Sequence, residues 1–391
     1  MITPIPEIVS TVEAFEALKP HWDLLVEQMA VPTPFMRWDW VWRWVGKFGG
    51  QHRLSVGVLR DDLGVPLAIA PFVISRGDKP PRRWLRHLTW IGGMGEVLGE
   101  RMDVIVPAGR ETELTPRLLR CMDATHKQWD VVWLPAVPVE SANLPAMKEA
   151  LDRVGMGAEE VKIHPCRFTE IPKDWPAYEA ARSSRWRRNL RNRWAVFIDE
   201  HGGRRGLSDT DMPHAEALDH LARLHLLQWP EGESNFLRPA SWEFHRGLAL
   251  EWLESGRAML SLLIAGDRVV AAAYGLVKRG QFSLYQQGWD PEFKHLSIGN
   301  LVVHWSLETA AQRGLHTYDM LSGDSRYKAE WCPSLRHTVD LETFQPERMS
   351  AQGFRVLRQF RRGWDNLTGG SAVLSDEAAD AKNHASRVAA V

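Results

Sequence analysis

The chain has 391 residues with 48 basic and 49 acidic side chains, and its hydrophobic content of 44% is typical of a soluble globular protein. Because the charges nearly cancel, no overall field favours binding to nucleic acid. The uncharged run at residues 63–75 is shorter than the roughly 20 residues of a membrane helix. The first ten residues, MITPIPEIVS, lack the basic and apolar regions of a secretion signal, so we do not expect secretion. Three widely spaced cysteines suit a reducing cytosol without zinc, so we expect a cytoplasmic protein of two domains, with no metal and no membrane insertion.

The first patterned segment, RWDWVWRWV at residues 37–45, holds four of the 19 tryptophans. Alternating tryptophans would suit a strand, but the apolar side chains also recur at helical spacing after a Thr-Pro start signal. The helical stripe comprises Phe35, Trp38, Val41, Trp42 and Val45. We predict a helix whose aromatic side chains pack in the core or between domains, in preference to stacking a sugar or a base.

The next segments repeat one order of elements in each half of the chain. The first half predicts a hairpin around DDLG, the strands RWLRHLTWIGG and MDVIVP, a helix over residues 111–126 and the strand WDVVWLP. The second half predicts a hairpin around AGD, the strand FSLYQQGW, a helix over residues 298–313 and the strand HTYDML. We infer an internal duplication of one α/β unit.

Between the halves, a strand over residues 161–170 closes the first domain, and a helix follows Pro172 and Pro176 and ends at Gly202. Two more helices are expected, one over MPHAEALDHLARLHLLQW and one over residues 242–255. The predicted domains are residues 1–170 and 171–368, and the Ala- and Ser-rich tail, residues 369–391, is expected to be partly disordered. The helix that ends at Gly202 contains five closely spaced arginines: Arg185, Arg187, Arg188, Arg191 and Arg193.

That arginine-rich segment has two interpretations. Such a run is usually a solvated helix face paired with neighbouring acids, or it contributes to an acceptor site. It can also bind tRNA or another polyanion through phosphate contacts. With a net charge near zero, we favour the first interpretation.

The stretch DPEFKHLSIGN, residues 290–300, places basic, polar and small residues at the start of the helix predicted from residue 298. The first turn of a helix has N–H groups without internal partners, so a phosphate can bind there. The alternative is that Ser297 is an ordinary N-cap and Gly299 a small residue in the first turn.

Five sequence blocks carry a resemblance to a known family: PFMRWDWVWRWVGKFG, SSRWRRNLRN, LHLLQW, YQQGWDPEFKHLSIGNL and YDMLSGDSRYKAEW. They resemble the tandem-GNAT family of cellulose-biosynthesis (CelD-like) acetyltransferases, which is similar to the FemAB and FemX aminoacyl transferases. The resemblance implies an α/β fold of two tandem GNAT-like domains, with mixed sheets flanked by helices. The first domain would be a degenerate copy, since IGGMGEVLGE precedes a predicted strand and no helix. Ile298 departs from the family, which usually has proline there.

The resemblance implies a coenzyme A site at the loop before the second repeat's helix, with a Tyr that protonates the leaving sulfur. The residues expected to contact acyl-CoA are Gln287, Gly288, Lys294, His295, Ser297, Ile298, Gly299, Asn300 and Lys328. The candidate catalytic residues are Tyr327 as acid, Asp324, Asp319 and His225 as bases or amine anchors, and Tyr285 as a second Tyr. The candidate acceptor contacts are Arg188, Asn189, Arg191 and Gln286.

His225 and Asp324 also have structural interpretations in place of catalytic ones. A single His on an apolar helix face is more often a core residue, and Asp324 can equally be a loop cap. The main hypothesis is an acyltransferase that uses acetyl-CoA or another acyl-CoA and an amine or hydroxyl acceptor, either a small molecule, a saccharide or a peptide. The family implies exopolysaccharide or envelope metabolism. The alternatives are a FemX-like transferase with aminoacyl-tRNA as donor and a non-catalytic binding module.

Overall fold

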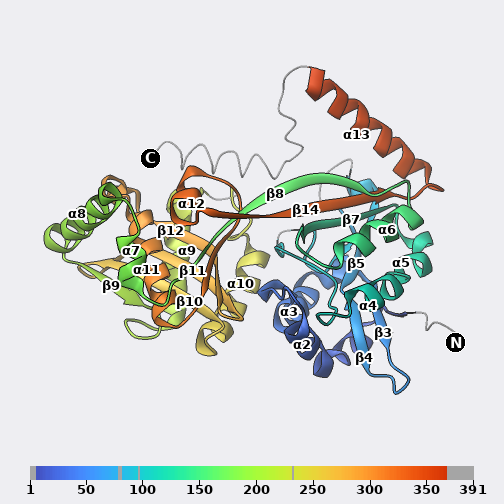
Figure 1. Cartoon of the computed structure of the whole chain (residues 1–391), viewed down its shortest axis with the longest axis horizontal. Coiled ribbons are helices and arrows are strands. Elements are labelled where there is room, and N and C mark those ends of the chain that lie inside the picture. Colours follow the sequence, from blue (N-terminus) through green and yellow to red (C-terminus); the bar gives the residue numbers. More distant parts are fainter. Residues whose placement is uncertain (1–5, 78–81, 96, 231–232, 368–391) are drawn as a thin grey trace. The chain divides into compact units, whose positions relative to one another are not determined.

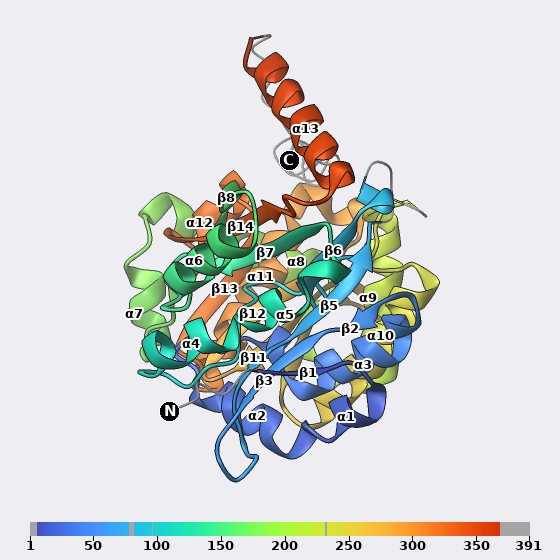
Figure 2. The same cartoon turned by 90° about the vertical axis from the view of Figure 1, so that its right-hand side faces the viewer.

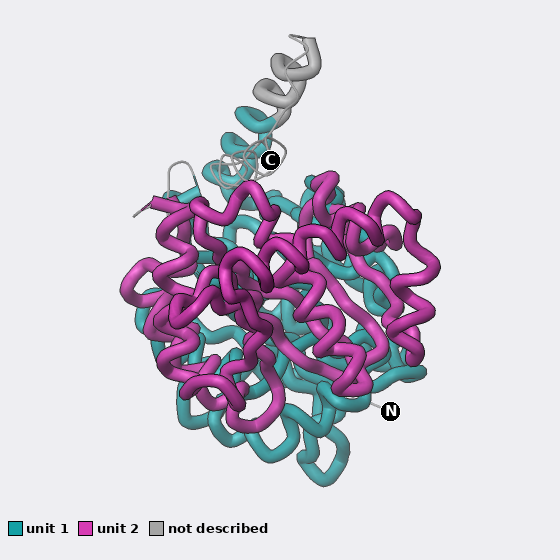
Figure 3. The backbone as a smooth tube through the Cα atoms, turned by 90° about the vertical axis from the view of Figure 1, so that its left-hand side faces the viewer, with its two compact units in different colours: residues 1–164, 337–375 teal, residues 165–336, 376–391 magenta. Residues whose placement is uncertain are grey.

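The computed structural model describes residues 6–77, 82–95, 97–230 and 233–367, with side chains described as far as Arg358. The described residues form two compact units, which Figure 3 distinguishes by colour: unit 1 contains residues from 6 to 164 and from 337 to 367, and unit 2 contains residues from 165 to 336. Residues 337–367, which we assigned to the second domain, therefore group with unit 1. The tail predicted to be disordered lies outside the described residues.

Unit 1 combines a three-stranded sheet of order β1-β3-β4 with strands in the order β2-β5-β6-β7-β14-β8. Figure 1 labels β3, β4, β5, β7, β8 and β14 among these strands. Its strands are β1 (Glu7–Val9), β2 (Arg53–Leu54), β3 (Val56–Arg60), β4 (Pro66–Ala70), β5 (Phe72–Arg76), β6 (Arg86–Trp90) and β7 (Val131–Pro138). Its helices are α1 (Val12–Glu16), α2 (Lys19–Gln28), α3 (Trp38–Phe48), α4 (Glu111–Leu118), α5 (Cys121–Ala124), α6 (Leu144–Val154) and α13 (Met349–Leu367), with the 3₁₀ turns η1 (Pro34–Met36), η2 (Gly49–Gln51), η3 (Arg82–Trp84) and η4 (His126–Gln128).

Unit 2 has strands in the order β8-β13-β12-β11-β10-β9. Its own strands are β9 (Gly203–Leu207), β10 (Ala258–Ala265), β11 (Arg268–Lys278), β12 (Gln281–Trp289) and β13 (Thr317–Ser322). Its helices are α7 (Trp175–Ala180), α8 (Ser184–His201), α9 (His214–Gln228), α10 (Pro239–Glu254), η5 (Pro291–Leu296), α11 (Ile298–Gln312) and α12 (Arg326–Trp331). Both β8 (Glu159–Glu170) and β14 (Ser334–Phe344) have residues in each unit.

The predicted duplication is confirmed in the topology. In unit 1, β5 and β6 are antiparallel, α4 and α5 follow, and β7 returns parallel to β6. In unit 2, β11 and β12 are antiparallel, α11 follows, and β13 returns parallel to β12. In unit 1, α4 packs against β3 and β4, and α6 against β7 (Figure 2). The fold class is the predicted one, a mixed α/β protein with helix-flanked mixed sheets in both units.

The tryptophan-rich segment forms α3, and the predicted helix is confirmed. Trp38, Trp40 and Trp44 are buried, while Trp42 is half-buried and stacks on Trp38 with ring centroids 5.3 Å apart. Phe35 lies before this helix in η1. These aromatic side chains therefore serve as core.

Two expectations about secondary structure are wrong. The segment MDVIVP contributes only an isolated bridge between Ile105 and Ile69, because Ile105 exchanges both backbone hydrogen bonds with Ile69 and no longer ladder follows. The single helix expected before Gly202 is two helices, α7 and α8, because Ser183 starts a new helix by accepting a hydrogen bond from the Trp186 N–H. Gly202 ends α8 in the left-handed conformation as predicted.

Candidate functional site

The second half of β12 lacks a strand partner on one side. The parallel ladder between β12 and β13 covers only Gln281–Ser283 and Thr317–Asp319, although β12 continues to Trp289. On its other side β12 pairs with β11, and Tyr285 is the extra residue of a β-bulge, since Tyr274 lies opposite Gln286 and Gly275 opposite Leu284. The strand edge over residues 286–288 can therefore offer backbone groups to a ligand.

The helix α11 begins just beyond this strand, and its first turn is open. Ser297 has a left-handed backbone (φ 49°) and makes no side-chain capping bond, so the N-cap interpretation is wrong. The backbone N–H groups of Ile298 and Gly299 donate no hydrogen bond within the described part of the chain. An uncapped helix start with free donors is the arrangement that binds anionic groups.

The predicted loop residues have different surroundings. Lys294 is exposed and its ammonium group has no acidic partner among the described residues. His295 is also exposed, and its Nδ1 lies 3.2 Å from the Glu292 carbonyl oxygen. Asn300 accepts a hydrogen bond from Trp331 Nε1 at 2.8 Å, so it holds α12 and does not face a ligand with its Oδ1.

Helix α12 connects β12, β13 and α11. Tyr327 Oη donates to Gln287 Oε1 at 2.8 Å, and Gln287 Nε2 donates to the Gly299 carbonyl at 3.4 Å. The Lys328 ammonium group donates to the carbonyl oxygens of Met320, at 2.7 Å, and Ser322 at the end of β13. Lys328 is thus bound to backbone oxygens instead of presenting its charge to a phosphate.

Tyr327 has the chemistry of an acid. Burial raises the pKa of its hydroxyl above the ordinary value, so the group stays protonated at neutral pH. Because its proton already points to Gln287, a hydrogen-bond chain runs from Tyr327 to the mouth of α11.

The two aspartates have structural partners. Asp319 is fully buried, forms an ion pair with Arg336, and accepts hydrogen bonds from Gln281 Nε2 at 3.2 Å and the Leu321 N–H at 2.8 Å. Asp324 is exposed and lies 2.7 Å from Arg167 Nη2. Neither carboxylate is placed as a free base, and their contacts support a structural role.

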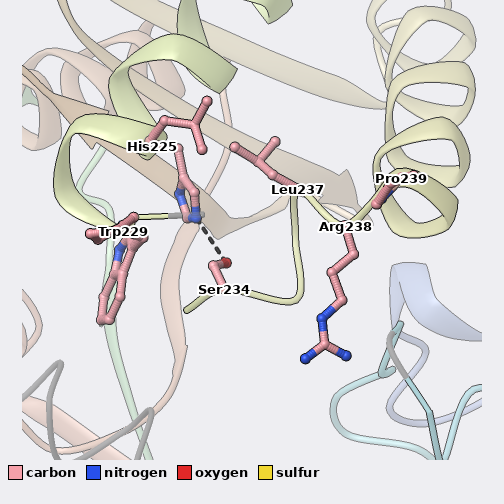
Figure 4. A pocket seen from close by; sticks show the side chains of 8 residues that line it. His225, Trp229, Ser234, Leu237, Arg238 and Pro239 are labelled. Atoms are coloured by element: carbon pink, nitrogen blue, oxygen red, sulfur yellow. Dashed lines mark hydrogen bonds between the residues drawn. The ribbon is translucent and has the colours of Figure 1, made fainter. Parts of the chain in front are cut away.

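His225 lies on α9 beside the end of β12. A Cβ atom at Gly288 would approach the His225 backbone nitrogen to 2.8 Å, so only glycine permits this contact. The buried imidazole has Nε2 2.9 Å from Ser234 Oγ (Figure 4). It borders a pocket of about 180 Å³ that is also lined by Leu226, Trp229, Pro230, Ser234, Leu237, Arg238 and Pro239.

Tyr285, the bulge residue, faces a histidine that the sequence did not single out. Its hydroxyl lies 3.5 Å from His245 Nε2, and Phe236 packs on the His245 ring at 4.9 Å. Burial lowers the pKa of His245 to about 3, so the imidazole is neutral in the folded protein at neutral pH.

The low pKa of His245 predicts acid sensitivity. The unfolded chain, with an ordinary His pKa of about 6.5, binds a proton below that pH, whereas the folded chain does not, so stability falls as pH decreases from 6.5. We expect this residue alone to contribute a loss of about 2 kcal/mol between pH 7.5 and pH 5. Urea unfolding at both pH values measures it.

The His245→Gln variant should show a shallower decline of stability between these pH values, even if it is less stable at both. The exposed His295→Gln variant is the control and should follow the wild type. An unchanged pH dependence in His245→Gln would contradict the prediction.

A second unforeseen histidine lies in the core of unit 2. His304 on α11 accepts a hydrogen bond from Trp194 Nε1 at 3.2 Å and contacts Glu179 Oε1 through Nε2 at 2.9 Å. Burial lowers the pKa of His304 to about 4, against the opposing effect of Glu179. Because Trp194 requires an acceptor at Nδ1, the neutral tautomer with the proton on Nε2 fits both partners.

The arginines of α8 do not pair with acids among the described residues, so the expected pairing is wrong, although three of the five side chains are solvated as expected. Arg188, Asn189 and Arg191 are exposed, as is Arg185, while Arg187 and Arg193 are half-buried. None of the five arginines forms an ion pair with any described residue, and the Arg187 Nε atom is buried without a partner. The side chain of Gln286, the remaining predicted acceptor contact, is half-buried on β12.

Neither a membrane-spanning helix nor a metal-binding group occurs in the described ranges. No helix there is long and apolar enough to cross a membrane. No group of three or more His, Cys, Asp and Glu side chains there is arranged to hold a metal ion.

One family of known proteins matches part of the second half of the chain. Residues 184–329 match the sequence profile of a family described as "Acetyltransferase (GNAT) domain". This segment contains β12, the open start of α11 and Tyr327. The chain matches no curated protein by sequence.

Solved structures show the fold over most of the chain. FemX has a TM-score of 0.55 at 13% identity, covering 86% of this chain and 97% of FemX. A protein of unknown function from Bacteroides thetaiotaomicron gives 0.51 at 11% identity, covering 87% of this chain and all of that one. The C-terminal domain of a putative lysylphosphatidylglycerol synthetase from Agrobacterium fabrum gives 0.50 at 9% identity, covering 87% and 95%.

Proposed function

We propose that the chain is an N-acyltransferase that moves an acetyl or longer acyl group from acyl-CoA to an amine, or to a hydroxyl group. The match of residues 184–329 to an acetyltransferase domain supports this class. The observation that carries the proposal is the hydrogen-bond chain from Tyr327 through Gln287 to Gly299, because it joins a protonated hydroxyl to an anion-accepting helix start.

In this proposal the free N–H groups of Ile298 and Gly299, with Lys294 nearby, hold the pyrophosphate of coenzyme A. The thioester lies along the unpaired edge of β12, where backbone N–H groups polarise its carbonyl. The amine nitrogen attacks the carbonyl carbon, the C–S bond breaks, and Tyr327 gives its proton to the departing thiolate. His225 accepts the proton that the new amide nitrogen releases, and both groups re-equilibrate with water.

The acceptor is proposed to enter through the pocket beside His225, where Trp229 offers an apolar face and Arg238 a positive charge. A small molecule, saccharide or peptide with an amine fits this role, and the CelD-like resemblance suggests exopolysaccharide or envelope metabolism in the cytoplasm. Incubation with acetyl-CoA and longer acyl-CoA, with a panel of amino sugars and amino acids, tests the proposal by release of free thiol. Binding of coenzyme A without turnover would favour a non-catalytic binding module, and absence of both would overturn the proposal.

The unpaired arginines of α8 favour one rival donor, aminoacyl-tRNA. If tRNA is the donor, we expect measurable tRNA affinity that falls steeply with salt, because each phosphate contact releases counterions. Replacing Arg185, Arg188 and Arg191 with Gln should weaken binding and reduce the salt slope by roughly one for each phosphate group that is no longer neutralised. Filter binding or fluorescence anisotropy over a range of salt concentrations measures both.

The control is a triple variant of equal charge that replaces the exposed Arg120, Lys162 and Lys173 with Gln. It should bind tRNA like the wild type. Wild-type binding that is undetectable at low salt would remove aminoacyl-tRNA as the donor and leave acyl-CoA.

A further inference from the structure

Unit 1 contains a second pocket, which has no residue in common with the proposed transferase site. It has a volume of about 470 Å³ and opens where β2, β5 and β6 lie beside η2 and η4. Its lining residues are Gly50, Gln51, His52, Arg53, Ile74, Ser75, Arg76, Arg86, Lys127 and Gln128. Four of these carry a positive charge and none carries a negative one.

The pairing of β2, β5 and β6 places three of the four cationic side chains on one face of the sheet. Arg53 on β2 lies opposite Ile74 on β5, and Arg76, two residues further along β5, lies opposite Arg86 on β6. Because residues two apart on a strand share a face, and opposite residues share it too, the three arginines lie on one face of the sheet. Like charges placed directly opposite each other destabilise a strand pair, so this arrangement has a cost.

Internal partners offset only part of that charge. Arg86 forms an ion pair with Asp130, with Nη2 and Oδ1 2.8 Å apart. Arg76 Nη1 donates to the carbonyl oxygens of Arg83 at 3.5 Å and Trp84 at 3.3 Å, which carry no full charge. The exposed side chains of Arg53 and Lys127 have no hydrogen-bonding or ionic partner among the residues that the structure describes.

The pocket is also built for a polar ligand of limited size. Its volume lies within the range of roughly 300–1,000 Å³ that small-molecule sites occupy. Ser75, Gln51 and Gln128 add hydroxyl and amide groups to the cations, and the Arg side chains can bind oxyanions with two parallel N–H groups. A small molecule is therefore large enough to fill the pocket, and no polymer such as a nucleic acid is needed.

We propose that this pocket of unit 1 binds a small, multiply charged oxyanion of the phosphate type, either pyrophosphate itself or a phosphate ester. Arg53 and Lys127 supply the charges that the ligand neutralises, and Arg86 is held in place by Asp130. The site is independent of the transferase proposal, since all its residues belong to unit 1 and the acyl-CoA site is proposed in unit 2.

Calorimetry with inorganic phosphate, inorganic pyrophosphate and glucose 1-phosphate at low salt tests the proposal. Pyrophosphate should bind more tightly than phosphate because it carries more charge, and the sugar phosphate shows whether an ester is accepted. The double variant Arg53→Gln, Lys127→Gln should bind pyrophosphate roughly tenfold or more weakly, because two of the four cations are removed. Both side chains are exposed and make no hydrogen bond or ion pair with the described residues, so the fold should survive.

The matched control is Arg120→Gln, Lys162→Gln, which removes two exposed charges of unit 1 outside the pocket. It should retain wild-type affinity. Equal affinity in the two double variants, or no binding of pyrophosphate by the wild type, would overturn the proposal. Release of free thiol from acetyl-CoA, measured on the same variants, reports on the transferase site separately, because coenzyme A binding alone would involve the same phosphate groups that this pocket is proposed to bind. Failure of one proposal is therefore distinguishable from failure of the other.

Discussion

Tyr327→Phe should slow thioester cleavage by roughly 10²-fold, a typical contribution of a general acid, while the protein stays folded. The substitution keeps the ring and removes the proton that now points to Gln287 Oε1 at 2.8 Å. Loss of this hydrogen bond should lower the free energy of unfolding by only about 1 kcal/mol. Stopped-flow measurement of thiol release, alongside thermal unfolding, separates the two effects.

Tyr178→Phe is the matched control, because Tyr178 is a buried tyrosine of unit 2 whose hydroxyl contacts Arg182 instead of the proposed site. It should lose a comparable amount of stability and keep its turnover. If Tyr327→Phe keeps near-normal turnover in a folded protein, the acid is a different group, and Tyr285 beside His245 is the next to test.

Gly299→Asp should abolish measurable binding of coenzyme A. A Cβ atom at this position would lie 2.9 Å from Gln287 Nε2 and 3.2 Å from the Trp289 ring, so a side chain occupies space at the helix start. The added carboxylate also repels the pyrophosphate from the free N–H groups of Ile298 and Gly299. Calorimetry with coenzyme A measures the affinity.

Gly299→Asn separates these two causes, because asparagine has nearly the same shape as aspartate and no charge. We expect the Asn variant to bind weakly and the Asp variant to bind at least about tenfold more weakly still. Wild-type affinity in the Asp variant would place the pyrophosphate elsewhere. Equal affinities in the two variants would mean that the added side chain weakens binding by steric exclusion and not by charge repulsion.

Local patterns predicted the elements of the site well. The apolar period over residues 298–313 and the turn residues on either side are enough to place α11, and the alternation in FSLYQQGW places β12. The conformation of Ser297 could not be predicted, because serine before a helix usually caps it, and only the folded loop holds this residue at a positive φ.

The contacts that decide the role of a polar residue were the hardest to foresee. His304 appears in the apolar run LVVHWSLETAA, and its partners Trp194 and Glu179 are 110 and 125 residues away in the chain. Asp319 is likewise fixed by Arg336, which follows it by 17 residues across α12. A one-dimensional pattern indicates that such a side chain is polar, but not which distant group will satisfy it.

The division of unit 1 between the two ends of the sequence affects the order of events during synthesis. Its residues 1–164 emerge from the ribosome before residues 337–344, which supply β14 beside β7, and all 172 residues of unit 2 from 165 to 336 are made in between. At a translation rate of roughly 5–20 residues per second, the edge of β7 that pairs with β14 stays unpaired for about ten seconds or more. Unit 2 is continuous from residue 165 to 336 and can complete its sheet first, so the later half of this chain should be the earlier one to fold.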